Sequence, residues 1–174
     1  AGNISGLGDN STEELAQGMG HELVDVPADS FKVLTDRYLD KGMDFIKISV
    51  TDHNSPNPQP LLFTKPELET MVQEAHKRGE RVDSHTNTVE GLRLAALVGI
   101  DVVQHPEALR GDGNTPLAMP DDVAHLLAQR HVICSSFAGR RMDNAIGGLG
   151  TSSDRQQMRA NIQTLIKDGC QLSV

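Results

Sequence analysis

The stretch that decides the fold is "ERVDSHTNTVEGLRLAALVGIDVVQHPE", residues 80–107. It contains two short apolar runs, each ending on a histidine, and these residues, His85 and His105, are twenty positions apart. The intervening "NTVEGLRLAALVG" has the apolar spacing of a helix and ends at Gly99. A strand, a helix and a second strand that follow one another with only short connections predict two parallel strands joined by a crossover helix. The two histidines should therefore lie at the same end of neighbouring strands.

The same unit recurs along the chain. Helices are predicted at "PADSFKVLTDRYLDKG", "TKPELETMVQEAHKRG", "MPDDVAHLLAQR" and "SSDRQQMRANIQTLIKDG", which are residues 27–42, 64–79, 119–130 and 152–169. In the second of these, Thr64 and Glu67 have the spacing of a capping box. Short strands follow at "DFIKISV", "RVDSH", "IDVVQH", "HVICSSF" and "CQLSV", and a strand end is predicted at "AGNIS". This α/β alternation fits either a doubly wound open sheet or part of a (β/α)8 barrel, with residues 1–174 as a single domain.

Composition narrows the class of protein. Aromatic residues make up 3% of the chain, so the core must be aliphatic. The net charge of -8 argues against a nucleic-acid or anionic-membrane surface, since phosphates need a basic partner surface. No apolar run is long enough to span a bilayer. Cys134 and Cys170 lie in apolar stretches and are expected to be buried and reduced, which favours the cytoplasm, although a mature secreted or periplasmic protein would look the same.

Polar, ligand-capable side chains stand at the ends of three successive predicted strands. Lys47 follows its helix-ending glycine by five residues, and His85 and His105 follow theirs by six. Active sites of α/β folds lie at the carboxyl ends of the strands. A lysine inside the apolar run "FIKIS" is costly to bury unless it is neutralised or paired. The three residues together therefore indicate a functional site.

These segments resemble a known family. "GMDFIKIS" and "AHKRGERVDSHTNTVEGLRLAALVGIDVVQHPE" are similar to the amidohydrolase superfamily, in the branch of imidazolonepropionase-like and prolidase-like enzymes. The resemblance runs from about "AGNIS" to "CQLSV". Its most specific part combines the lysine strand, the "H-x-N-x-x-E-G" turn and the "G-I-D-x-x-x-H" strand.

The resemblance implies a (β/α)8 TIM barrel of the metal-dependent hydrolase type, present in part from about strand 3 to strand 8. Lys47 would be a lysine carboxylated by CO2 that bridges two divalent metals, and His85 and His105 would be metal ligands. One or two ions, usually zinc, would supply an activated hydroxide. The implied reaction is hydrolysis of a C–N bond in an amide, peptide or cyclic amide. Prolidase-like or carboxypeptidase-like cleavage of a small dipeptide-like substrate is the first expectation.

Two features of the family pattern are missing. The His-x-His pair of the first strand occurs nowhere in the 174 residues, and the catalytic Asp of the eighth strand is expected just after Val174. No catalytic residue is therefore assigned within the chain. We expect an incomplete form of the barrel, inactive or weakly active in isolation.

Further polar residues fall in loops that are predicted to follow strands. His21, His53 and Arg140 are candidates for contacting substrate. A solvated loop position explains His21 equally well and is the favoured interpretation of His53 and Arg140. Arg140 could bind a substrate carboxylate. Asn87, two residues after His85, has its simplest interpretation as part of the cap of the following helix.

Two other functions remain open on the sequence. Lys47 could be a Schiff-base nucleophile of a lyase, its pKa lowered by burial. Alternatively, the chain could be a noncatalytic barrel fragment whose exposed sheet edges make it self-associate, and a homo-oligomer of the intact enzyme also remains open. The pair of histidines favours the metal-dependent hydrolase over the lyase.

Overall fold

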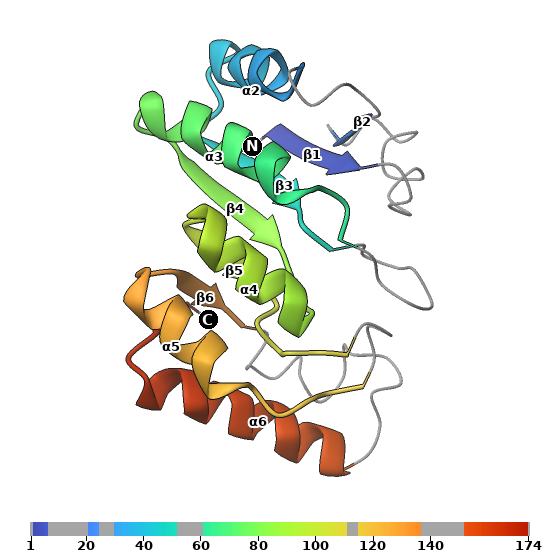
Figure 1. Ribbon diagram of the computed structural model, residues 1–174, viewed down its shortest axis with the longest axis vertical. Helices are drawn as coiled ribbons and strands as arrows, with labels where there is room; N and C mark the ends of the chain where they lie inside the picture. The colour runs from blue at the N-terminus through green and yellow to red at the C-terminus, as the bar shows by residue number, and fades with distance from the viewer. Residues whose placement is uncertain are drawn as a thin grey trace.

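The computed structural model describes residues 2–6, 21–24, 30–51, 61–110, 115–136 and 152–173, in which strands and helices alternate (Figure 1). The strands are β1 (Gly2–Gly6), β2 (His21–Val24), β3 (Phe45–Ser49), β4 (Arg81–His85), β5 (Val102–Gln104), β6 (Ile133–Ser135) and β7 (Gln171–Ser173). The helices are α2 (Ser30–Asp40), α3 (Lys65–Lys77), α4 (Val89–Val98), α5 (Asp121–Gln129) and α6 (Ser152–Lys167). The predicted helices, and the predicted strands with them, are confirmed.

The strands form one parallel sheet in the order β2-β1-β3-β4-β5-β6-β7. From β3 to β7 the order follows the chain, because each helix crosses from one strand to the next. One strand differs from the prediction. The segment 21–24 was expected to be a loop, yet it pairs with β1 at the edge of the sheet, with His21 opposite Asn3.

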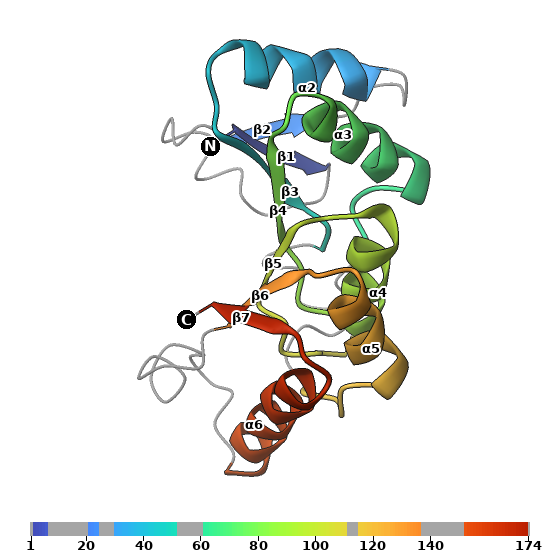
Figure 2. The ribbon, with the colours of Figure 1, turned by 90° about the vertical axis from the view of Figure 1, so that its left-hand side faces the viewer.

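A single layer of helices covers the sheet. Figure 2 shows α3, α4 and α5 on the same side, and α2 packs against α3 while α6 packs against α5. The described part of the chain is therefore not a doubly wound sheet, which carries helices on both faces. A parallel sheet with one outer layer of helices is compatible with part of a (β/α)8 barrel, and closure into a barrel stays a prediction.

The two faces of the sheet differ in chemistry. Ile46, Ile48, Val82 and Cys134 are fully buried beneath the helices. Because side chains alternate along a strand, the residues between them point to the other face. That face carries the polar residues of β3, β4 and β5, namely Lys47, Ser49, Asp83, His85 and Gln104. Pairing places Lys47 beside Asp83, Ser49 beside His85, and His85 in turn beside Gln104.

The helix ends follow the predicted signals. Glu67 Oε2 accepts a hydrogen bond of 2.7 Å from the Thr64 backbone N–H, so the predicted capping box at α3 is confirmed. The glycines that end the helices before β3, β4, β5 and β7 all have a left-handed φ of 78–89°. A side chain would be strained in that conformation, which explains why glycine recurs at this point in four of the five units, whereas the unit of α5 and β6 has His131 with a φ of 55°.

The two cysteines are free and buried, as predicted. Among the described helices there is none that combines the length and the apolar character required to cross a bilayer.

Candidate functional site

The site is built around His85 and His105, which the structure brings together. His85 is the last residue of β4 and is 7% exposed. His105 follows β5 directly, and its backbone N–H donates to the Ser135 carbonyl at 3.0 Å. The two ring centroids are 4.9 Å apart, with the ring planes inclined at 58°. Two imidazoles at this separation, at the carboxyl end of a parallel sheet, can approach one ligand together.

The backbone of His105 explains how the rings meet. Because His85 and His105 each follow a helix-ending glycine by six residues, they were predicted to occupy matching positions on neighbouring strands. Strand pairing instead aligns His85 with Gln104, one residue before His105. In a regular strand His105 would point to the opposite face from Gln104. Its φ of 67° interrupts the alternation at that position. A left-handed conformation is uncommon for a residue other than glycine, and such strain is frequent at functional sites.

Lys47 lies on the same face and forms an ion pair that the sequence analysis missed. Its Nζ is 3.4 Å from Asp83 Oδ2, and both side chains are largely buried. Gln104 Nε2 donates to the same Asp83 oxygen at 2.6 Å. Burial lowers the pKa of Lys47 to about 8, against the opposing charge of Asp83. Burial likewise raises the pKa of Asp83, against the effect of Lys47. Desolvation thus outweighs the attraction for both partners.

Asn87 does not cap the helix that follows it, contrary to the prediction. The N-cap of α4 is Thr88, whose side-chain oxygen accepts from the Gly91 N–H at 3.1 Å. Asn87 Oδ1 instead accepts from the Thr51 hydroxyl at 3.0 Å. This contact ties the end of β3 to the turn after β4. Asn87 therefore belongs to the rim that surrounds the histidines.

A second polar cluster supports the loop after His105. Asn161 of α6 donates from Nδ2 to the carbonyls of Glu107 and Leu117, at 2.8 and 2.7 Å. Its Oδ1 accepts from the Met119 N–H at 2.8 Å. Glu107 is 3% exposed, and its carboxylate accepts from Ser136 Oγ at 3.4 Å. Asn161 thus fixes the loop that begins with His105.

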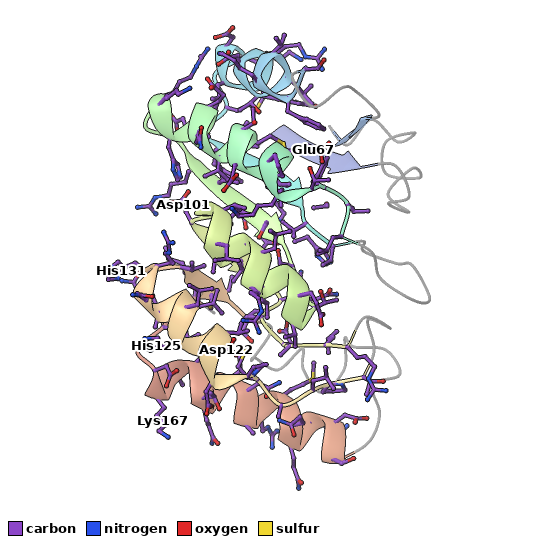
Figure 3. All side chains as sticks on the ribbon, in the orientation of Figure 1. Glu67, Asp101, Asp122, His125, His131 and Lys167 are labelled. Atoms are coloured by element: carbon purple, nitrogen blue, oxygen red, sulfur yellow. The ribbon has the colours of Figure 1, made fainter. Side chains whose placement is uncertain are left out.

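A hollow of about 280 Å³ opens at the rim, lined by Gln104, His105, Ser135 and Ser136. It gives a small molecule access to His105, the outer member of the histidine pair along the sheet. The other described histidines lie elsewhere. His76 Nε2 is 2.8 Å from Asp101 Oδ2, and Figure 3 shows Asp101 and His131 on the side where the strands begin. His125 lies on α5, and the positions of these three histidines give no reason to assign them a role in the site.

The remaining sequence candidates do not join this cluster in the described residues. His21 begins β2 instead of lying in a rim loop, and through Asn3 it is in register with Lys47, two strands away. Nothing is described of its side chain. His53 and Arg140 lie outside the described residues.

The histidine pair fits part of a zinc site. Neutral imidazole is a preferred zinc ligand, and tetrahedral sites take four ligands. In the described ranges no three His, Cys, Asp or Glu side chains are arranged to hold a metal ion. Of the four ligands of a tetrahedral site, the pair would supply two. Lys47 becomes an oxygen ligand only if its amine is carboxylated.

Comparison with known proteins places the fold. No protein-family profile and no curated protein sequence matches the chain. Among solved structures, a prolidase in complex with N-methylphosphonate-L-proline matches with a TM-score of 0.73 at 14% identity, over 99% of this chain and 46% of that one. A Xaa-Pro dipeptidase with bound methionine matches with a TM-score of 0.70 at 19% identity, over 98% and 45%. The ochratoxinase of A. niger gives 0.73 at 15% identity, over 99% and 44%.

These matches define the fold. The chain has the fold of part of an amidohydrolase-type protein, as the sequence resemblance predicted. It spans less than half the length of the solved chains it matches. At these identities the likeness establishes the fold, and the chemistry has to be argued from the site.

Proposed function

We propose that the protein is a metal-dependent hydrolase of C–N bonds, acting on an amide, a dipeptide or a cyclic amide. The observation that carries the proposal is the histidine pair, with imidazole centroids 4.9 Å apart at the carboxyl rim of a parallel sheet. Its structural neighbours include prolidases and a phenylurea hydrolase, and both names describe cleavage beside an amide nitrogen. We favour a prolidase-like or carboxypeptidase-like reaction on a small dipeptide-like substrate.

His85 and His105 would hold a divalent ion, which we take to be zinc, and Lys47 would join them after carboxylation by CO2. A divalent ion bound there would lower the pKa of water and polarise the carbonyl of the scissile bond. The chain's own residues fix the ligands. The His105 N–H is anchored on Ser135, and Asn161 holds the loop that follows. Ligands held in this way need little reorganisation on binding.

We propose further that residues 1–174 form a single, partial barrel domain, from about strand 3 to strand 8. The His-x-His pair and the Asp expected after Val174 would then come from flanking sequence. Coverage of 44–46% of the solved chains supports this. The two free, buried thiols favour a cytoplasmic location. The Schiff-base alternative is not favoured, because the solved structures of similar fold named above are hydrolases.

Cobalt titration of the isolated chain tests the ligand assignment. Co²⁺ bound through imidazole nitrogen should produce a visible absorption band, saturable but weak because most ligands of the full site are missing. His85→Asn and His105→Asn should each remove the band. His125→Asn, on the exposed side of α5, is the matched control and should leave it unchanged. A band that survives both rim substitutions would refute the assignment.

Hydrolysis itself is tested on the protein encoded by the parent gene. Release of the C-terminal residue from Xaa-Pro dipeptides and N-acyl amino acids should require zinc and should be lost in His85→Asn. Turnover by metal-free protein at an undiminished rate would contradict the proposal.

A further inference from the structure

We propose that Cys134 and Cys170 form a peroxide-sensitive thiol pair, which closes into a reversible disulfide between β6 and β7. This inference is independent of the proposed hydrolysis, because neither cysteine belongs to the histidine site. The whole sequence contains these two cysteines and no other, so an intramolecular disulfide can form in one way only.

The sheet places both thiols on the same face of neighbouring strands. β6 and β7 pair in parallel with Cys134 opposite Leu172, and Figure 2 shows the two strands side by side. Cys170 precedes Leu172 by two residues, so strand alternation puts it on the face of Cys134, beneath the helices. The Cys170 thiol donates to the Ala124 carbonyl of α5 at 3.5 Å, which agrees with that orientation. The two cysteines are therefore diagonal neighbours in one buried layer.

The two thiols differ in exposure and in acidity. Cys170 is 9% exposed, whereas Cys134 is fully buried. The neighbouring Cys134 thiol lowers the pKa of Cys170 against the effect of burial, while the Cys170 thiol and burial together raise the pKa of Cys134. Because the thiolate is the reactive form of cysteine, Cys170 is the sulfur that meets an oxidant first. Cys134 then acts as the resolving thiol, which needs no access to solvent.

Hydrogen peroxide is an oxidant small enough for a sulfur of such low exposure. The Cys170 thiolate attacks one peroxide oxygen, so that an S–O bond forms, the O–O bond breaks and hydroxide leaves. The sulfur is thereby oxidised to a sulfenic acid and the peroxide is reduced. The sulfur of Cys134 then attacks that of Cys170. The S–S bond forms, and the sulfenic hydroxyl group leaves with the Cys134 thiol proton as water.

Closure requires a small movement of β7. A disulfide holds its sulfur atoms about 2.05 Å apart, closer than two unbonded thiols can approach. β7 has 3 residues, and within the described sheet it pairs with β6 alone. A short edge strand can shift toward its neighbour without disturbing the strands beyond. In a reducing compartment the bond would be transient, because a dithiol reductant restores the two thiols.

Oxidation of the native protein tests the proposal. Stoichiometric hydrogen peroxide should remove both thiols, counted with a thiol reagent after denaturation, at a rate proportional to the peroxide concentration. Peptide mapping should show a link between Cys134 and Cys170 that dithiothreitol reverses. Cys134→Ala should instead stop at the sulfenic acid of Cys170, which dimedone captures. Cys170→Ala is the matched control and should give no dimedone adduct.

Retention of both thiols in native protein would overturn the proposal, as would disulfides that join only separate chains on a non-reducing gel. An oxidation rate that levels off at the rate of unfolding would also overturn it, because the native pair would then not be the reacting species. A dimedone adduct on Cys134 in Cys170→Ala, formed as fast as that on Cys170 in Cys134→Ala, would contradict the assigned order. If an alanine variant is unfolded by circular dichroism, the corresponding serine variant provides the same comparison.

Discussion

Replacing Asn161 by Ala should destabilise the protein more than any single surface change, because one side chain satisfies three backbone groups. The amide donates to the carbonyls of Glu107 and Leu117 at 2.8 and 2.7 Å, and it accepts from the Met119 N–H at 2.8 Å. Asn161 is 1% exposed. In Asn161→Ala these backbone groups lose their partner in a buried place.

The magnitude follows from the cost of an unsatisfied buried group, about 1–3 kcal/mol each. Partial hydration of the new cavity and the better helix propensity of Ala, roughly 0.5 kcal/mol, reduce the total. We expect a loss of about 3–5 kcal/mol in the free energy of unfolding, a large share of the stability of a domain.

Urea unfolding followed by far-ultraviolet circular dichroism measures this loss as a fall in the midpoint at constant slope. Gln157→Ala is the matched control, one turn earlier on α6. Its side chain makes only a side-chain bond to Asn161 Oδ1, at 3.0 Å, and the expected cost is about 1 kcal/mol or less. If Asn161→Ala costs no more than Gln157→Ala, the account of the loop anchor is wrong.

Three further outcomes are expected. Folding lowers the pKa of Lys47 from 10.5 to about 8, so the unfolded chain binds more protons than the folded one between those pH values. The free energy of unfolding should therefore rise with pH across that window, by about 3 kcal/mol at most, and this gain should be lost as pH falls through 8. In CO2-free urea titrations the rise should be missing in Lys47→Met, and a rise of equal size in both proteins would contradict its origin in Lys47. Gly91→Ala would place a Cβ atom 2.7 Å from Thr51 Cγ2 and should lower the free energy of unfolding by about 1–3 kcal/mol. The double variant with Thr51→Ser, which removes Cγ2, should recover part of that loss, and purely additive effects in urea unfolding would rule out the clash. Cys134 is fully buried, and the neighbouring Cys170 thiol together with burial raises its pKa, so a thiol reagent should label this cysteine at the rate of unfolding. Immediate labelling of Cys134 in the native protein would show that it is accessible.

The sequence was sufficient for the order of helices and strands, because each unit carries its own local signals. Caps, apolar spacing and helix-ending glycines are set by neighbouring residues. The edge strand β2 was missed for the opposite reason. His21–Val24 carries no strong strand signal of its own, and its pairing with β1 depends on contacts between distant segments.

The site was predictable in part. The meeting of His85 and His105 followed from the repeat, but the left-handed backbone at His105 did not, since nothing local predicts φ of 67° for a histidine. Asp83 could have been found. It lies two residues before His85, and alternation along a strand puts both on one face with Lys47. Glu107 and Asn161 meet across 54 positions of chain, which no local pattern reveals.

The left-handed glycines have a consequence for how the chain tolerates changes of length. Each glycine ends its helix at a fixed distance before the next strand. Which side chains of that strand point to each face of the sheet therefore depends on the few residues after the glycine, and not on the whole preceding chain. An extra residue in the loop before α3 would leave β4, which follows Gly79, in phase. An extra residue between Gly99 and Gln104 would instead turn the strand over and exchange its polar and apolar faces. Insertions and deletions should therefore be admitted between the units and excluded from the few residues that follow each glycine.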